Sequence, residues 1–280
     1  MIIFKQAKPL TDYLETEQKV GKKIGLVPTM GALHNGHLSL IKSSKSNNDI
    51  TVCSIFVNPT QFNNPEDFKH YPITIEKDIE QLITAGCDVL FLPGVEAIYP
   101  SGYQKKHYNL GSIENSLEGF YRPGHFQGVC QVVDRLLQII NPDNLYMGQK
   151  DFQQCMVIKK LLELTGKDKI IRLNISPTIR ENDGLAMSSR NLRLNDTEKI
   201  LATSIYKELT AIKNNFHLKP LHSLIQMAKD HLQEKNFAVD YVEIANMQDL
   251  NPAKNSEEPS VALIAASIGN VRLIDNLILN

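Results

Sequence analysis

The sequence predicts an α/β protein in which a doubly wound parallel sheet is followed by a second, smaller α+β domain at the C-terminus. The main observation is that short apolar runs alternate with helical patterns through the first two-thirds of the chain. This rhythm is typical of strand–helix–strand units in a sheet that helices cover on both faces. The rhythm changes after about residue 176, where two helical patterns precede the next strands. With 280 residues, the chain is long enough for one large and one smaller domain.

In the first part, five apolar runs are expected to be strands, at 24–28, 50–57, 88–92, 144–147 and 170–176. Four intervening segments with helical patterns are expected to be helices, near 36–46, 74–86, 126–140 and 152–165. This arrangement is Rossmann-like. Ligands of such sheets bind beyond the carboxyl ends of the strands, where the loops gather. The polar motifs described below fall at these ends, so we expect them to form one site.

In the second part, the order of elements indicates a small α+β unit. Helices are expected at 196–214 and 219–235, and strands near 239–246, 261–267 and 271–276. Gly269-Asn270 is a signal for a two-residue hairpin turn between the last two strands. We place the domain boundary at Pro177, so that residues 1–176 form the larger domain and residues 177–280 the smaller one.

The composition is that of a soluble globular protein, with 42% hydrophobic and 22% charged residues. A formal net charge of −1 gives no reason to expect nucleic acid or an anionic membrane as a partner. No segment approaches the roughly 18 apolar residues that cross a bilayer, and no signal-peptide pattern is present. Cys53, Cys87, Cys130 and Cys155 form no C-x-x-C pair, which predicts reduced, partly buried thiols in a cytoplasmic protein.

The most informative segment is 24–37, Ile-Gly-Leu-Val-Pro-Thr-Met-Gly-Ala-Leu-His-Asn-Gly-His. A buried strand ends near Pro28, and Gly31 leads into a helical pattern. His34 and His37 are three residues apart at the start of that helix, so their rings face the same side. Free backbone N–H groups and the helix dipole favour a phosphate at such a position. Two imidazoles there suggest chemistry on the phosphate of a nucleotide.

Other interpretations of this segment have less support. Gly31 and Gly36 have the spacing of a Walker loop. However, His37 and Leu38 stand where that motif requires a lysine and a hydroxyl residue. No Gly-x-Gly-x-x-Gly follows any strand, and no nearby cysteine or acidic residue completes a metal site with the histidines. Two surface histidines without a function remain an alternative.

A second polar cluster, 56–62, follows the strand expected at 50–57. Asn58 and Gln61 can donate and accept hydrogen bonds without carrying charge, which suits a polyhydroxy or carboxylate substrate. A turn in which Asn58-Pro59 only ends the strand is an equally good interpretation.

A third cluster, 146–154, joins the end of a strand to the start of a helix. Gly148 ends the strand, and Lys150 at the helix entrance is well placed to meet a phosphate as a point charge. Asp151 could cap the helix, and Gln154 lies one turn later and could reach the same cleft.

A fourth cluster, 179–191, lies at the expected domain boundary. Ser188, Ser189 and Arg190 offer two hydroxyls and a guanidinium, which suit a triphosphate whose charge shifts during a reaction. A closing loop would be useful at this place. A polar turn without a function is the alternative interpretation.

These clusters together resemble known signatures. His34-Asn-Gly-His37 with Met187-Ser-Ser-Arg190 resembles the paired motifs of the nucleotidyl-transferring superfamily that includes class I aminoacyl-tRNA synthetases. Five stretches resemble the pantothenate synthetase (pantoate–β-alanine ligase) family in the same order, at 27–37, 56–62, 122–128, 148–151 and 185–191. Five ordered motifs are far more specific than any single one.

The resemblance implies a two-step ligation. Pantoate would attack the α-phosphate of ATP to give pantoyl adenylate and pyrophosphate, and β-alanine would then displace AMP to give pantothenate, on the route to coenzyme A. Because the first attack joins two anions, cancelled charge and alignment matter more than a strong base. The domain 1–176 would bind ATP and pantoate and carry the catalytic residues, and the domain 177–280 would be a lid.

The resemblance also assigns roles to residues. The ATP site would consist of Met30, Gly31, Ala32, Leu33, His34, Asn35, Gly36, His37, Gly148, Gln149, Lys150, Asp151, Ile179, Met187, Ser188, Ser189 and Arg190. The catalytic residues in it would be His34, His37, Lys150 and Arg190, with His37 as the proton donor and both rings adding positive potential. Pantoate would be held by Gln61 and Gln154 with help from Asn58, and Arg122 would touch the phosphate region.

Further expectations concern cofactors and partners. ATP would be a substrate, with Mg²⁺ held mainly by its phosphates. No protein metal ligand is assigned, since Glu76 and Asp78 match only loosely. The small-molecule partners would be pantoate, β-alanine and ATP, and the chain would form a homodimer. Two alternatives stay open, a simple nucleotidyltransferase that stops after the first displacement and a non-catalytic nucleotide sensor. The loop with Gln61 favours the ligase over the former, and groups aimed at a transition state disfavour the latter.

Overall fold

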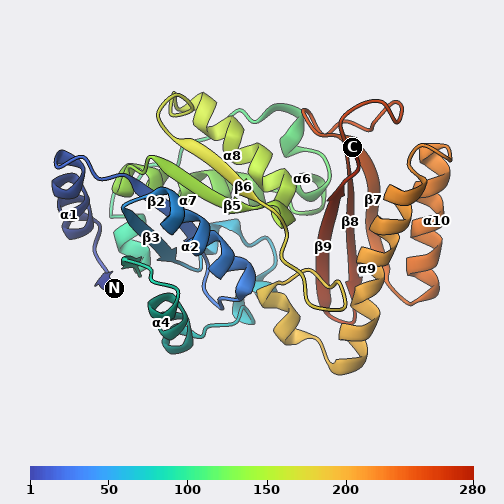
Figure 1. Cartoon of the computed structure of the whole chain (residues 1–280), viewed down its shortest axis with the longest axis horizontal. Helices are drawn as coiled ribbons and strands as arrows, with labels where there is room; N and C mark the ends of the chain where they lie inside the picture. The colour runs from blue at the N-terminus through green and yellow to red at the C-terminus, as the bar shows by residue number, and fades with distance from the viewer.

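A computed structural model describes residues 1–280 and contains two sheets (Figure 1). The larger sheet is entirely parallel, in the order β1-β4-β3-β2-β5-β6. Its strands are β1 (Ile2–Phe4), β2 (Ile24–Thr29), β3 (Ile50–Ile55), β4 (Val89–Phe91), β5 (Asn144–Gly148) and β6 (Arg172–Ser176). The smaller sheet is antiparallel and consists of β7 (Ala238–Asn246), β8 (Ser260–Ile268) and β9 (Val271–Ile278). The predicted fold class is confirmed.

The connections are mostly helical. The α-helices are α1 (Ala7–Lys19), α2 (Asn35–Asn47), α3 (Pro65–Lys69), α4 (Ile75–Thr84), α5 (Val95–Ile98), α6 (Glu118–Tyr121), α7 (His125–Ile140), α8 (Phe152–Leu164), α9 (Asp196–Asn215) and α10 (Leu221–Glu234). Four 3₁₀ turns, η1 (Pro59–Gln61), η2 (Gly111–Glu114), η3 (Gln149–Asp151) and η4 (Ser189–Arg193), lie in the loops. The expected strands and long helices all form, with bounds that differ by a few residues. β3 ends at Ile55 because the chain then turns into η1, where Asn58 accepts a hydrogen bond from Thr60 N.

The two faces of the larger sheet are covered by different helices, and successive residues of one strand pack on opposite sides. Leu26 belongs to a buried cluster with α7 and α8, whereas Val27 belongs to a cluster with α2 and α4. Because both faces are buried, these strands are near-continuous apolar runs rather than alternating ones. No helix combines the length and the apolar character that a membrane crossing demands.

The order of strands places a crevice between β2 and β5. The chain runs from β2 outward through β3 and β4 on one side, and it returns to β5 and β6 on the other. Loops that follow β2 and β5 therefore diverge at the carboxyl edge of the sheet. This topological switch point is where doubly wound sheets bind their ligands.

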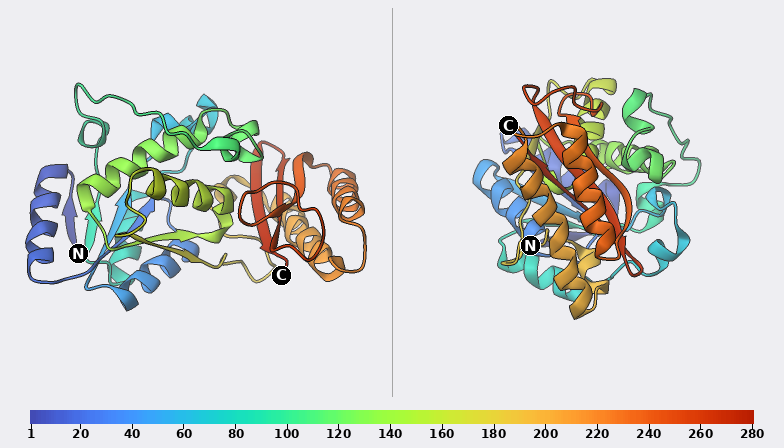
Figure 2. Two further views of the ribbon diagram at one scale, coloured as in Figure 1. Left: turned by 90° about the horizontal axis from the view of Figure 1, so that it is seen from above. Right: turned by 90° about the vertical axis from the view of Figure 1, so that its right-hand side faces the viewer.

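The smaller sheet lies between the larger one and the last two helices (Figure 2). Its outer face packs on α9 and α10, in a cluster that includes Ile205, Leu224 and Ile264. Its inner face contributes Tyr241 and Leu263 to an apolar contact with Phe152 at the start of α8. The α8 helix follows β5 after the short η3 turn, so this contact brings the smaller sheet beside the crevice.

Candidate active site

A cavity of about 220 Å³ lies at the switch point between β2 and β5. It is lined by the segments that follow β2, β5 and β6, which carry the predicted motifs, and by one side of α7. Three cationic side chains line it, namely Arg122, Lys150 and Arg190, and Asp151 is its only carboxylate. This excess of positive charge suits an anionic ligand.

The two histidines form a reciprocal cap at the start of α2. Gly36 N donates to His34 Nδ1 at 3.1 Å, and His34 N donates to His37 Nδ1 at 3.4 Å. The rings lie against each other with centroids 4.0 Å apart and their planes tilted by 33°. A Cβ at Gly36 would lie 2.8 Å from the His34 ring, so only glycine leaves room for this arrangement. Because each Nδ1 accepts, the proton of each neutral ring is on Nε2.

The surroundings of both imidazoles favour the neutral form. Burial and the charge of Lys150 lower the pKa of His34 to about 4. Burial, His34 and Lys150 together lower the pKa of His37 well below its ordinary value. Because the site desolvates both rings beside a lysine, their charged form is disfavoured, which speaks against the expectation that they add positive potential. They offer Nε2–H groups as hydrogen-bond donors instead.

The expected free amide groups before α2 are also partly occupied. Asp78 is fully buried on α4, and its carboxylate accepts from Ala32 N at 2.9 Å and from Leu33 N at 2.8 Å. Thr74 Oγ1 donates to the same carboxylate at 3.0 Å. These bonds stabilise Ala32 at a φ of 48°, which is unusual for a residue with a side chain. Asp78 thus shapes the turn after β2.

Lys150 lies on η3, between β5 and α8. Its side chain is 18% exposed and lies 3.7 Å from Asp151. Asn276 of β9 donates through Nδ2 to the carbonyls of Gln149 and Lys150, at 2.9 and 2.8 Å. Gln149 Nε2 returns a bond to Asn276 Oδ1 at 3.2 Å. The turn that carries the lysine is therefore fixed by the smaller sheet.

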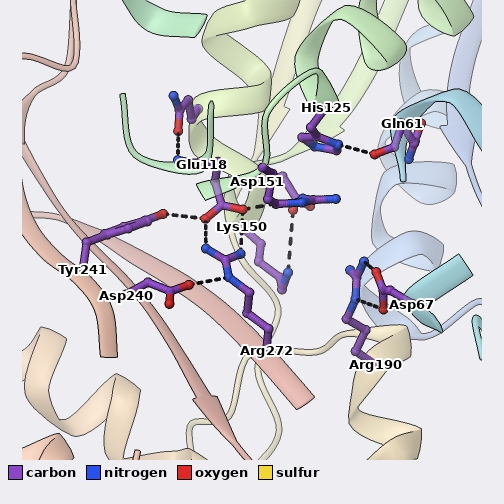
Figure 3. A network of polar contacts seen from close by, with 12 residues as sticks. Gln61, Asp67, Glu118, His125, Lys150, Asp151, Arg190, Asp240, Tyr241 and Arg272 are labelled. Atoms are coloured by element: carbon purple, nitrogen blue, oxygen red, sulfur yellow. Dashed lines mark hydrogen bonds and ion pairs between the residues drawn. The ribbon is translucent and has the colours of Figure 1, made fainter. Parts of the chain in front are cut away.

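Gln61 lies at the end of η1 with its side chain on the cavity wall. Its amide contacts Met30 Sδ at 2.8 Å and accepts from Asn58 Nδ2 at 3.2 Å. His125 Nδ1 donates to the Gln61 carbonyl at 2.8 Å (Figure 3). At Gly128 a Cβ would lie 2.3 Å from Thr60 O, so glycine lets α7 press against η1. The segment 122–128 thereby supports the loop that carries Gln61.

The turn after β6 closes the cavity on its other side. Ser188 caps η4 by accepting from Arg190 N, and Ser189 Oγ donates to Ala32 O at 3.0 Å. Arg190 donates to Asp67 of α3 through Nε and Nη2, at 3.4 and 2.7 Å. Burial would lower the pKa of Arg190, but the bonds and charge of Asp67 outweigh it and raise the pKa.

A wider cleft of about 980 Å³ opens between the larger and smaller sheets, and Arg122, Lys150 and Arg190 line both spaces. In its wall, Glu118 accepts from Arg272 at 2.7 and 2.8 Å and from Tyr241 Oη at 2.9 Å (Figure 3). Burial would raise the pKa of Glu118, but Arg272 lowers it to about 2. This buried ion pair joins α6 to β9.

The structure brings most of the predicted site together. The predicted residues that line the 220 Å³ cavity are Met30, His34, Gly36, His37, Gln61, Gly148, Lys150, Asp151, Gln154, Ile179, Met187, Ser188, Ser189 and Arg190. Those that do not line it are Gly31, Ala32, Leu33, Asn35, Asn58 and Gln149. Asn58 is 1% exposed and lies behind Gln61, so it holds that side chain rather than facing the cavity.

Sequence reasoning missed the apolar wall of the cavity. Val129, Val132, Val133 and Leu136 project from α7 into it. The signal was present, because α7 is rich in Val, Leu and Ile, and 13 of its 16 residues are buried. Such a helix has apolar positions beyond those that the sheet covers. No group of His, Cys, Asp and Glu side chains is arranged to hold a metal ion.

Comparisons with known proteins show similarity over nearly the whole chain. A sequence model of the family described as pantoate-β-alanine ligase matches residues 2–278. The pantothenate synthetase of Cytophaga hutchinsonii is 45% identical over 285 residues, which cover 100% of this chain and 99% of the relative. That of Aquifex aeolicus is 43% identical over 283 residues, with 98% of each chain covered.

Two solved structures are similar over almost their whole length. The pantothenate synthetase of Thermus thermophilus superimposes with a TM-score of 0.93 at 35% identity, covering 100% of this chain and 99% of that one. The pantoate-β-alanine ligase of Francisella tularensis, complexed with β-γ ATP and β-alanine, has a TM-score of 0.83 at 40% identity, with 99% and 97% covered. The chain therefore belongs to the pantoate–β-alanine ligase family, also called the pantothenate synthetases.

Proposed function

We propose that this pantoate–β-alanine ligase, which makes pantothenate from pantoate, β-alanine and ATP, works through a pantoyl adenylate held in the 220 Å³ cavity. A carboxylate oxygen of pantoate forms a bond to the α-phosphorus of ATP, and the bond to pyrophosphate breaks. The β-alanine nitrogen then bonds to the acyl carbon, and AMP leaves with the electrons of the broken C–O bond. The amine proton passes to solvent.

One observation carries this proposal: the cavity joins cationic side chains and imidazoles to uncharged amides and an apolar wall. Lys150 and Arg190 would balance the charge that develops on the phosphates, and the Nε2–H groups of His34 and His37 would donate to phosphate oxygens. Gln61 and Gln154 would hold the pantoate carboxylate and hydroxyls, and the α7 valines would pack on its methyl groups. A neutral His37 would act as a donor of a hydrogen bond and not of a proton.

We propose that Mg²⁺ binds with ATP. Magnesium keeps phosphate oxygens and waters as most of its ligands and needs only one or two carboxylates. The single carboxylate of the cavity, Asp151, fits this requirement. The ion would neutralise charge on the phosphates with Asp151 among its ligands, while Lys150 would orient them.

Three further expectations stay proposals. The domain boundary at Pro177 follows β6, the last strand of the larger sheet, and residues 177–280 would act as the lid. A cytoplasmic location is favoured by four free, buried cysteines. A homodimer is expected from the family resemblance alone. Sedimentation velocity would measure the mass in solution, and small-angle scattering with and without ATP would detect closure.

Two assays test the proposal. The purified chain with ATP, pantoate and β-alanine should form AMP and pantothenate in equal amounts. Without β-alanine, it should exchange labelled pyrophosphate into ATP only when pantoate is present. A stable adenylate that β-alanine does not consume would favour the simple nucleotidyltransferase, and nucleotide binding without turnover would favour the sensor.

A further inference from the structure

Asp67 forms ion pairs with two arginines and thereby joins two loops of the site. Arg190 reaches it through Nε and Nη2 (Figure 3), and Arg193 Nη1 donates to its Oδ1 at 2.8 Å. Asp67 lies on α3, six residues after Gln61, whereas both arginines lie on η4. The carboxylate therefore links the loop that carries Gln61 to the turn that closes the cavity.

The geometry of the ion pair with Asp67 leaves one edge of the Arg190 guanidinium without a hydrogen bond. A guanidinium has five N–H groups, and a side-on pair through Nε and Nη2 occupies two of them. The Nη1 edge makes no hydrogen bond in the structure, and Arg190 lines both the 220 Å³ cavity and the wider cleft. Its guanidinium carbon also lies 5.8 Å from the centre of the Tyr71 ring. The group is thus held at one edge while another edge is available.

The charges of the cluster indicate that Asp67 does not simply block this arginine. Two guanidinium groups share one carboxylate, so one positive charge is left over. If a triphosphate met the Nη1 edge, Asp67 could keep its contacts with both arginines. Without Asp67, Arg190 would have to lose much of its side-chain freedom when ATP binds, which opposes the productive orientation.

We infer that Asp67 is a positioning residue for adenylate formation, which holds the guanidinium of Arg190 in the orientation that meets the phosphates of ATP. This inference rests on the proposed role of Arg190. Asp67 acts through Arg190 and has no contact of its own with substrate. Its place on α3 also ties the orientation of Arg190 to the loop that carries Gln61.

The test compares variants in the pantoate-dependent exchange of pyrophosphate into ATP. In Asp67→Ala we expect kcat to fall about 10- to 100-fold, the range for a misplaced catalytic group, with a smaller change in the KM for ATP. Asp67→Asn keeps a carbonyl oxygen that can accept from Arg190, so it should recover part of the loss. Glu66→Ala is the matched control, because it removes the same charge from the same helix without a contact to Arg190.

Two other results for Asp67→Ala would contradict the inference. A lower KM for ATP with unchanged kcat in Asp67→Ala would overturn the inference, because it would make Asp67 a competitor of the phosphates. A lower unfolding temperature with unchanged kinetics would also overturn it. If Asp67→Ala does not fold, the comparison of Asp67→Asn with Glu66→Ala decides.

Arg190→Gln separates the inference from the proposed function. Full exchange activity in Arg190→Gln would refute the role of Arg190 itself. A strong loss in Arg190→Gln without a loss in Asp67→Ala would refute only the positioning role of Asp67. If the inference holds, the double variant is no slower than Arg190→Gln alone, because both changes remove the same contribution.

Discussion

The arrangement of His37 predicts that two conservative substitutions have different effects. Its Nδ1 accepts from His34 N, and its Nε2–H group is available to a phosphate oxygen. An asparagine oxygen can take the place of Nδ1 but leaves no donor at the position of Nε2. A glutamine amide can place an N–H group near the position of Nε2 but does not keep the cap. The two functions of one ring can therefore be removed separately.

The two substitutions should lower the rate of adenylation to very different extents. Loss of a donor to a charged transition state lowers the rate about 10²- to 10³-fold, so His37→Asn should lose that much adenylation activity. Loss of a helix cap typically costs about 0.5–2 kcal/mol of stability. The hydrogen bond of 3.4 Å is long, which places His37→Gln at the lower end of that range. We expect His37→Gln to lose stability and less than about tenfold in rate, and His37→Ala to lose both.

Pantoate-dependent pyrophosphate exchange measures the rate, and thermal unfolding measures the stability. The pH dependence supplies an independent check. Since the pKa of His34 is about 4 and that of His37 is lower than its ordinary 6.5, the rate should not fall with the titration of these rings between pH 6 and 8. A rate that falls about tenfold per pH unit above 6.5 would show that an imidazolium is required. Higher activity in His37→Asn than in His37→Gln would equally refute the reasoning.

Three other perturbations test the supports of the site. Gln61→Ala should raise the KM for pantoate and leave that for ATP nearly unchanged in steady-state kinetics, and an equal rise in both would speak against the assigned pocket. Gly128→Ala forces a Cβ to 2.3 Å from Thr60 O, so the free energy of unfolding in urea should fall by roughly 1–3 kcal/mol, and an unchanged midpoint would contradict this. Arg272→Met leaves Glu118 buried with weaker partners and should cost roughly 3 kcal/mol. The pKa of Glu118, about 2, lies below its ordinary 4.5. The stability from this ion pair is therefore present above pH 4.5 and is lost as the pH falls toward 2. The stabilities of wild type and variant should converge in acid.

The sequence predicts the larger sheet well because burial on both faces leaves a strong local signal. β2 and β3 are fully or largely buried over their length, and such strands are apolar runs bounded by turn residues. β1 has no such signal, since it has three residues and is exposed at Ile2 and Ile3. It is a strand because it adds to the edge of β4, which is a tertiary contact.

The candidate site is predictable as a set of residues but not as a set of hydrogen bonds. The motif at 34–37 identifies two imidazoles at a helix start, but the direction of their bonds depends on rotamers that the pattern does not specify. The carboxylate of Asp78 accepts hydrogen bonds from the backbone N–H groups of Ala32 and Leu33, which are 46 and 45 residues away in the sequence. A long-range acceptor of this kind leaves no local pattern. For the same reason, Asn58 has the same sequence signature whether it faces a substrate or supports Gln61.

The position of β9 determines which part of the C-terminal region can move. Asn276 bonds the two carbonyls of η3, and Arg272 bonds both oxygens of Glu118, so β9 is fixed to the larger sheet at two places. A rotation away from β9 would break four hydrogen bonds at buried groups, each worth about 0.5–1.5 kcal/mol or more when charged. The η4 turn is held by Asp67, by one bond from Ser189 to Ala32 O, and by one bond from Arg193 Nη2 to Asn270 O between β8 and β9. Closure over ATP should therefore pivot on β9, so that Lys150 stays in place while Arg190 moves with the turn.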